Sequence, residues 1–473
     1  MSLKKLQYFK KILLNNLPFV FLLVFFTAIY SYVSIVKHEH YQTLTWDTGF
    51  FDQLIWKLSR FKNPVSSFSG FNIFGDHFQL VLIFLTPLYW LPYSLHLLLT
   101  TQAAVAVFSS IPIYLLCTKL LKNKFLAFSI CLSFLLFVPF QFAILDGFHQ
   151  SVFSVLFYSC ALYALFLKKS RLYWISILGL IITKEEMALL AASVGIVAFF
   201  SKEKTKGTVT FLTCIVAFFV IIKLIIPLVQ GSYVHYGYGI LGNTPSEILI
   251  NSLKHPDLFV KNLVSPPVKL QSVLQAVLSF GFLPLFSPTL LVPAIQQFVV
   301  RFLDSVSVHR WLNLNQYSFP MAPIMAIATI FTVQKIIKKF NLKVALIAVF
   351  IMFSAILQDY IYHGPINSLF KRDFYVKKQW MRDNDEVIKY IPQHASVATT
   401  NNLGPHISQR DSLYFLSKTN TSDYLLFDLE DDRVKYSPQS YQETLEVFNK
   451  EVQSGNYEIY KNIGKSYLLK KRQ

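Results

Sequence analysis

The first residues that could do chemistry lie in the segment Thr45-Trp46-Asp47-Thr48-Gly49-Phe50-Phe51-Asp52-Gln53. Asp47 and Asp52 flank aromatic side chains, and apolar surroundings of low dielectric constant raise the pKa of a carboxyl group. A carboxylate with a pKa nearer to neutrality is a better general base, so both acids are candidate catalytic residues. The alternative is an amphipathic helix whose acidic side chains are solvated.

Three further polar clusters follow along the chain, at Asp76-His77, Asp146-Gly147-Phe148-His149 and Lys184-Glu185-Glu186. The third cluster separates two short apolar runs, each about 20 Å long as a helix and thus shorter than a bilayer core of about 30 Å. Ionisable groups at membrane depth usually mark a substrate path. Lys184 could hold a phosphate as a point charge. The alternative is a Lys–Glu pair that only braces two helices.

The elements that must position these residues are membrane-spanning helices. Of the 473 residues, 53% are hydrophobic and 15% are charged, whereas soluble chains carry about 25% charged residues. A spanning helix needs about 20 mostly apolar residues. The apolar runs predict 11 crossings, at Leu17–Val36, Leu97–Cys117, Phe125–Ile144, Ser151–Leu167, Leu172–Thr183, Met187–Phe200, Val209–Val229, Leu270–Phe286, Leu290–Val300, Phe319–Ile337 and Leu342–Leu357. The pair on either side of Pro288 could instead be a re-entrant hairpin.

Positive charges orient these crossings. Lysines before the first run place the N-terminus in the cytoplasm, and basic clusters fall at every second connection: Lys119/Lys122/Lys124, Lys168/Lys169/Arg171, Lys202/Lys204/Lys206 and Lys335/Lys338/Lys339/Lys343. An odd number of crossings puts the C-terminal part outside, together with 11 of the 12 carboxylates before Ile361. We therefore expect a multi-pass protein of the cell (plasma) membrane with an outward-facing polar site.

The first outer loop, residues 37–96, holds Asp47, Asp52, Asp76 and His77. Loops of this length are usually functional. The stretch Phe78–Leu91 in it is short and contains Pro87, so we predict a helix that lies at the membrane interface and does not cross.

Charge and cysteine placement exclude two other classes of protein. The net charge is +18, but the excess lies between apolar runs and not on one exposed face, so a nucleic-acid partner is not expected. The four cysteines all lie inside apolar runs, which predicts neither disulfides nor a zinc site: Cys117, Cys131, Cys160 and Cys214.

The C-terminal part, residues 361–473, has the charge balance of a soluble domain. Its patterning predicts a small α/β domain outside the membrane. The expected elements are helices over Asp383–Ile391 and Ser440–Val452, strands over Ser396–Thr400 and Asp423–Leu429, and a hairpin of Tyr457–Tyr460 with Ser466–Leu469. Residues 1–360 form the membrane domain.

The polar motifs above occur in a fixed order and are followed by the segment Ser396–Arg410, SVATTNNLGPHISQR. Together they resemble the family of predicted membrane proteins called domain of unknown function 2079, over most of the chain. One departure is Gly147, which separates Asp146 from the Phe-His pair. The family looks like a branch of the GT-C superfamily of integral-membrane glycosyltransferases. The fold expected is therefore an α-helical polytopic membrane protein, GT-C-like, with a small C-terminal α/β domain.

The resemblance implies a polyprenyl-phosphate sugar as donor, inversion at the anomeric carbon, and a glycan, lipid or protein acceptor in the cell envelope. Asp47 matches the essential acid of the first loop and would take the proton of the acceptor hydroxyl. Lys184, with His77 or His149, would stabilise the departing phosphate. A divalent cation, Mg²⁺ or Mn²⁺, could bridge Asp76 and the phosphate.

The remaining candidate substrate-binding residues are Asp146, Glu185, and in the tail motif Asn401, His406 and Arg410. The tail motif could bind the acceptor or close over the membrane cavity; the alternative is a turn whose Asn and Gly serve the backbone geometry. Two rival functions remain open. A transporter or flippase also uses intramembrane charge, but it predicts internal repeats with broken helices, and no convincing repeat is found. A non-catalytic protein of envelope assembly is the other.

Overall fold

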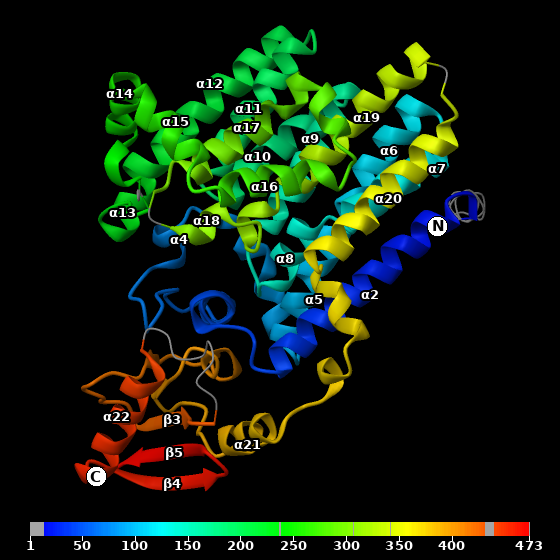
Figure 1. Ribbon diagram of the computed structural model, residues 1–473. Coiled ribbons are helices and arrows are strands. Elements are labelled where there is room, and N and C mark those ends of the chain that lie inside the picture. Colours follow the sequence, from blue (N-terminus) through cyan, green and yellow to red (C-terminus); the bar gives the residue numbers. More distant parts are fainter. Residues whose placement is uncertain (1–13, 236–237, 306, 341, 431–438, 473) are drawn as a thin grey trace, which may run out of the picture.

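The computed structural model describes residues 14–235, 238–305, 307–340, 342–430 and 439–472. A helical domain takes up most of the chain, and a small sheet domain follows it (Figure 1). In this view the N-terminal helix α2 and the late helix α20 both extend toward the sheet domain. The sheet domain lies beyond their ends, beside the first loop.

Among the described residues, five helical stretches are long and apolar enough to cross a membrane: α2 (Leu17–Glu39), α5–α6 (Ser94–Leu121), α12–α13 (Lys204–Gln230), α19 (Met321–Phe340) and α20 (Val344–Tyr362). A sixth span results if α7 (Lys124–Leu135) and α8 (Val138–Leu145), bent by 51°, count as one. The shorter apolar helices are α9 (Val152–Phe166), α10 (Ser170–Thr183), α11 (Met187–Phe200) and α16 (Val268–Leu278).

All 11 predicted apolar runs fall on helical segments, but helix length does not support 11 separate crossings. Counting hydropathy alone overlooks where helices break. The chain bends just before Pro139, where proline removes a helical donor. It also breaks at Lys184–Glu186, and at Gly281, whose φ of +59° does not suit a helix. Five to six crossings are therefore what length and composition show.

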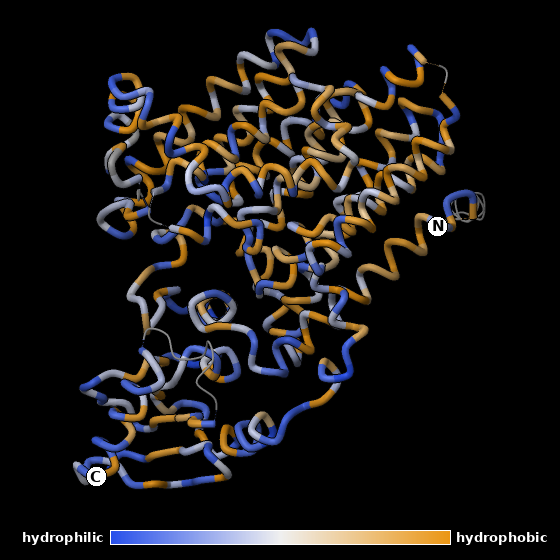
Figure 2. Tube along the Cα trace, in the orientation of Figure 1, coloured by the Kyte–Doolittle hydropathy of each residue, from blue (hydrophilic) through white to orange (hydrophobic). Residues whose placement is uncertain are grey.

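Figure 2 shows hydrophobic residues along most of the long helices. The α12–α13 stretch is only 22% buried inside the protein, although its mean hydropathy is 2.8. An apolar helix that exposes most of its surface is suited to lipid. The inner faces pack closely: a Cβ on Gly207 would lie 2.5 Å from the backbone nitrogen of Phe199, so α11 and α12 touch through their backbones.

The first loop folds into short elements with a core of their own. They are the π-helix η1 (Thr45–Gly49), α3 (Phe50–Ser59), α4 (Ile73–Asp76) and the 3-10 helix η2 (Leu80–Trp90). The α3 helix is buried almost throughout, Asp52 included at 1% exposure, so an amphipathic helix with solvated acids does not describe it. The predicted interface helix is η2, which buries Val81 and Leu85 and exposes Phe84 and Trp90.

The other helical segments connect these parts. They are η4 (Gly239–Leu241), α14 (Pro245–Lys254), α15 (Pro256–Val264), η5 (Leu283–Phe286), α17 (Pro288–Phe302), α18 (Val308–Trp311), η6 (Gln316–Ser318), η7 (Pro365–Phe370), η8 (Arg372–Tyr375) and η9 (Gly404–His406). The segment of η7 and η8 leads from the end of α20 to the sheet domain.

The sheet domain has five strands in the order β2-β1-β3-β5-β4. Strands β1 (Val397–Thr399), β2 (Leu413–Phe415) and β3 (Tyr424–Asp428) are parallel, and β4 (Tyr457–Ile463) and β5 (Ser466–Lys471) add an antiparallel hairpin. Helices α21 (Gln379–Ile388) and α22 (Tyr441–Gln453) pack on opposite faces. The predicted helices, strands and hairpin are confirmed; β2, with three residues, was not predicted.

Candidate functional site

Three of the predicted residues come together beside the first loop, in what we call the acid–histidine group: Asp47, Asp146 and His149. Asp47 lies in η1, Asp146 follows the end of α8, and His149 precedes α9. The Nε2 atom of His149 lies 4.0 Å from Asp47 Oδ1 and 3.8 Å from Asp146 Oδ2. This nitrogen is buried and has no hydrogen-bond partner among the described residues. A polar atom so placed suits a small polar group between the two acids.

The turn at Gly147 brings the side chains of Asp146 and His149 close to each other, next to Asp47. Gly147 has a φ of +102°, and a Cβ there would lie 2.5 Å from the hydroxyl oxygen of Thr48. The backbone N–H of Phe148 donates to that hydroxyl oxygen at 3.3 Å. Only glycine fits this conformation and approach without strain. Gly147 is therefore the residue that packs the turn against η1.

Gln102 of α5 fixes the same turn from the other side. Its Nε2 donates to the carbonyl oxygens of Ile144 and Gly147, and its Oε1 accepts the backbone N–H of His149 at 2.7 Å. Asn315 donates to Asp146 Oδ2 at 2.8 Å. A buried amide that uses both its donor and its acceptor holds the backbone rigidly.

The electrostatics of the group place two carboxyl groups near neutrality. Burial, and then the nearby Asp146, raise the pKa of Asp47 to about 7, while its side chain stays 38% exposed and so open to a reactant. Burial raises the pKa of Asp146 to about 6, against the opposing effect of Asn315. Burial, and then the charge of Lys184, lower the pKa of His149 to about 3, so its imidazole is neutral. Such a set can accept or donate a proton near pH 7.

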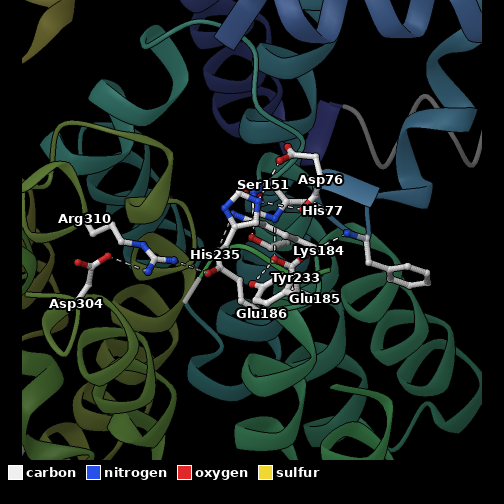
Figure 3. A network of polar contacts seen from close by, with 12 residues as sticks. Asp76, His77, Ser151, Lys184, Glu185, Glu186, Tyr233, His235, Asp304 and Arg310 are labelled. Atoms are coloured by element: carbon white, nitrogen blue, oxygen red, sulfur yellow. Dashed lines mark hydrogen bonds and ion pairs between the residues drawn. The ribbon is translucent and has the colours of Figure 1, made fainter. Parts of the chain in front are cut away.

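A second polar group, the stacked-histidine group, lies around Asp76 and His77 (Figure 3). The rings of His77 and His235 stack with centroids 4.0 Å apart. His77 Nδ1 is 2.7 Å from Glu185 Oε1, and His235 Nε2 is 3.0 Å from Asp76 Oδ1. Glu185 also accepts the hydroxyl of Tyr233 at 3.0 Å. The first loop, the α10–α11 break and the segment after α13 therefore meet at one point.

The charge of Lys184 acts on both the acid–histidine group and the stacked-histidine group. Lys184 is buried, and its Nζ lies 3.4 Å from Glu186 Oε1, while Glu186 also lies 3.7 Å from Arg310. A Lys–Glu pair is thus present, with Glu186 as the partner. Burial by itself raises the pKa of Asp76, but His77, His235 and Lys184 outweigh it, so this pKa lies below its ordinary value. The charge of Lys184 therefore acts on both His149 and Asp76.

The stacked-histidine group could hold a metal ion through Asp76, His77 and His235, whose ligand atoms lie within 4.8 Å of one another. With His77 Nδ1 on Glu185, Nε2 is left as its ligand atom, and a carboxylate behind a metal-binding imidazole is the usual arrangement. Two imidazoles suit Zn²⁺, Fe²⁺ or Mn²⁺ better than Mg²⁺. Both rings cannot reach one ion while stacked, so they must turn apart on binding.

The other predicted residues lie apart from these groups and attach the sheet domain to the first loop. Asp52 accepts hydrogen bonds from Tyr89 at 2.8 Å, Ser408 at 2.5 Å and Gln409 at 3.1 Å. Burial raises its pKa to about 6, against the effect of these three donors. Through these three hydrogen bonds, the Asp52 carboxylate connects α3 to η2 and to the tail motif.

Asn401, His406 and Arg410 make contacts of the same kind. The backbone oxygen of Asn401 accepts the N–H of Thr45 at 2.8 Å and its hydroxyl at 2.7 Å. The ring of His406 stacks on those of His38 and Tyr41, and Arg410 donates to carbonyl oxygens of its own domain, including that of Ala395 at 2.9 Å. The tail motif therefore lies on η1, two residues from Asp47.

The sequence alone did not identify His235, Gln102 or Asn315. Gln102 sits inside an apolar run and Asn315 in a connection, where single amides carry no local signal. His235 lies in the connection after the run Val209–Val229, which the positive-inside rule predicts to be on the outer side. The acids before Ile361 were expected almost entirely on the outer side. Asking which histidines are expected on that side would have drawn attention to His235.

The comparisons with known proteins concern the family. The family model described as "Predicted membrane protein (DUF2079)" matches residues 37–468. The matched region contains both polar groups and the sheet domain up to the middle of β5. No curated protein matches the chain.

Proposed function

The chain belongs to the DUF2079 family of predicted membrane proteins, and on that basis we propose that it is an inverting membrane glycosyltransferase. Its donor is a sugar on polyprenyl phosphate, and its acceptor is a glycan, lipid or protein of the cell envelope. The observation that carries the proposal is the unpartnered Nε2 of buried His149 between Asp47 and Asp146. This space is lined by groups that can exchange a proton near pH 7.

In the proposed reaction Asp47 takes the proton of the acceptor hydroxyl. The freed oxygen bonds to the anomeric carbon as the bond from that carbon to the phosphate oxygen breaks. The phosphate leaves with the bonding electrons, and the buried charge of Lys184 stabilises it. Asp146 raises the pKa of Asp47, and neutral His149 orients the acceptor hydroxyl.

The proposed orientation has the N-terminus in the cytoplasm and the sheet domain outside the plasma membrane. Basic residues occupy the α6–α7, α11–α12 and α19–α20 turns. These turns lie at the end of the helical domain away from the sheet domain (Figure 1). The positive-inside rule then favours the sheet domain on the outer side. Eleven crossings, as the apolar runs predict, would require short helices such as α10 and α11 to span a thinned bilayer.

The test is transfer by the purified protein in nanodiscs, with radiolabelled polyprenyl-phosphate sugars as donors and envelope extract as acceptor. We expect Asp47→Asn to lower the rate at least about 10²-fold, as loss of a general base does. Asp257→Asn, an exposed acid of α15, is the matched control. Full activity of the Asp47→Asn protein would remove Asp47 from this role.

Transport is the second candidate, and the broken helices favour it. The second helix of the bent α7–α8 pair ends directly before Asp146, and the α10–α11 break carries Lys184. Discontinuous helices beside charge are typical of transporter sites. Protein in liposomes that carries a lipid-linked sugar to the other leaflet, and transfers none of it, would establish transport instead.

A further inference from the structure

A large cavity separate from both polar groups lies where α2 ends and the sheet domain begins; we call it the basic cavity. It has a volume of about 960 Å³, near the upper end of small-molecule sites. Its walls come from the end of α2 and the following turn, from η7 and η8, and from the start of the sheet domain.

Positive charge dominates the lining. Lys37, Lys371, Arg372 and Lys378 line the cavity, against the single acid Asp373. Lys37 is engaged, since it donates to the carbonyl oxygen of Leu145. The side chains of Lys371, Arg372 and Lys378 are exposed and make no hydrogen bond or ion pair with another described residue. Three positively charged side chains that line the basic cavity are therefore available to a ligand.

A buried donor also faces the cavity. Asn402 is 1% exposed, and its Oδ1 accepts the hydroxyl of Thr400, but its Nδ2 has no partner among the described residues. A buried donor without a partner costs free energy, so its presence points to a group that binds there. The lining also includes the aromatic rings of Tyr41, Phe374 and Trp380, beside polar side chains such as Gln42. Such rings suit a sugar or hydrocarbon body.

We propose that the basic cavity binds a phosphate group carried on a sugar or lipid. A phosphomonoester carries a charge of about −1.5 to −2 at pH 7 and three acceptor oxygens, which matches several cations and an amide donor. The planar fork of Arg372 fits phosphate oxygens in pairs. Whether the sugar transfer proposed above takes place does not affect this site, because binding needs no turnover.

Two sources can supply this phosphate. Exposed aromatic and apolar side chains lie close to the lining residues along the chain, at Tyr360, Ile361 and Phe370. Aromatic side chains of this kind gather at the membrane interface, so a lipid headgroup can enter from the bilayer. A free sugar phosphate can enter from the water phase through the same exposed cations.

The experiment measures binding to the full chain in phosphatidylcholine nanodiscs. Glucose 1-phosphate is added as the free probe, and phosphatidic acid is incorporated into the nanodiscs as the lipid probe. Binding is measured by titration calorimetry and by native mass spectrometry. The variant is Lys371→Gln with Arg372→Gln and Lys378→Gln. We expect it to weaken binding at least about tenfold, the scale of one lost charge-assisted contact.

The matched control is Lys389→Gln with Lys465→Gln and Arg472→Gln. These side chains are exposed and paired with acids outside the cavity. Their substitution removes three positive charges, as the cavity variant does. Long-range attraction then falls equally in both triple variants. Binding of phosphatidic acid alone identifies a lipid headgroup, binding of glucose 1-phosphate alone a soluble ligand, and binding of both a site for phosphate itself. Binding of neither probe, or equal weakening in variant and control, overturns the proposal.

The Asp47→Asn protein separates the two proposals. It should bind both probes as the wild type does, because Asp47 does not line the basic cavity. If the Asp47→Asn protein loses transfer but still binds the probes, both proposals stand. If it keeps transfer, the role of Asp47 fails; if the wild type transfers sugar but binds neither probe, the phosphate site fails.

Discussion

The imidazole of His149 lies 4.0 Å from the carboxylate of Asp47, although the two residues come from a loop and from the start of a distant helix. Asp146 approaches the same nitrogen from the other side at 3.8 Å. Two carboxyl groups with raised pKa and a neutral imidazole are thereby brought to one point at the edge of the helical domain. The predictions that follow test this arrangement and its supports.

The pH dependence of transfer should follow the protonation of Asp47. Its raised pKa of about 7 means that the base is only partly ionised below neutrality. We expect kcat/KM to rise about tenfold per pH unit up to about pH 7 and then to level off. Because Asp146 contributes to the raised pKa of Asp47, Asp146→Asn should move this limb to lower pH. An unmoved limb would show that the charge of Asp146 does not act on the base.

Gly147 should tolerate no side chain. With a φ of +102° and Thr48 Oγ1 2.5 Å from the position of a Cβ, Gly147→Ala should destabilise the protein by about 1–3 kcal/mol. Thermal melting measures this. Gly455→Ala is the matched control, since Gly455 also has a positive φ, of +75°, but has no atom within 4 Å of its Cβ position.

The clash can be separated from the backbone strain by a double variant. Removing the Thr48 hydroxyl in Gly147→Ala with Thr48→Ala should recover part of the lost stability, because neighbouring changes are not additive. Equal melting of the Gly147 and Gly455 variants would contradict the account of this turn.

The stacked-histidine group should retain a transition metal. We expect protein purified without chelator to contain about one equivalent of Zn²⁺, Mn²⁺ or Fe²⁺, bound through Asp76, His77 and His235. His235→Ala should lose the metal, as measured by elemental analysis. His255→Ala, an exposed histidine before α15, is the control. Metal content that is equal in the two variants would remove His235 from the ligand set.

Asp52 should make stability depend on pH. Its pKa is raised to about 6 in the folded protein, against about 3.9 when unfolded. A raised carboxyl pKa gives stability that is present below about pH 4 and is lost as the pH rises to about 6. The difference in melting temperature between wild type and Asp52→Asn should therefore change over this interval and be flat above it. A difference that is constant from about pH 4 to about pH 8 would refute the raised pKa.

How much the sequence could predict differs between the two domains. Apolar runs predicted helices throughout the membrane part, because burial and lipid contact both select the same residues. They predicted 11 crossings, of which helix length and composition support five to six, because hydropathy does not register the bend before Pro139 or the break at Gly281. In the sheet domain β2 was missed because three residues are too few to show an alternation of side chains.

In the site, the sequence identified the side chains but not their partners. Asp47, Asp146 and His149 stood out as polar residues at the ends of apolar runs. Nothing local indicated that Asp52 and the backbone oxygen of Arg410 join the first loop to the sheet domain, since both roles arise from tertiary contacts. The same holds for His235, which reaches Asp76 across the end of α13.

The bonds from Thr45 to the backbone oxygen of Asn401 make the sheet domain inseparable from the loop below it. A chain that stops at Ile391 would leave Trp46 and its neighbours without their main-chain partner. Truncation would therefore disturb the segment that carries Asp47, even though every helix before Ile391 is kept. The C-terminal module is in this sense part of the support of the first loop and cannot be studied as a removable appendage.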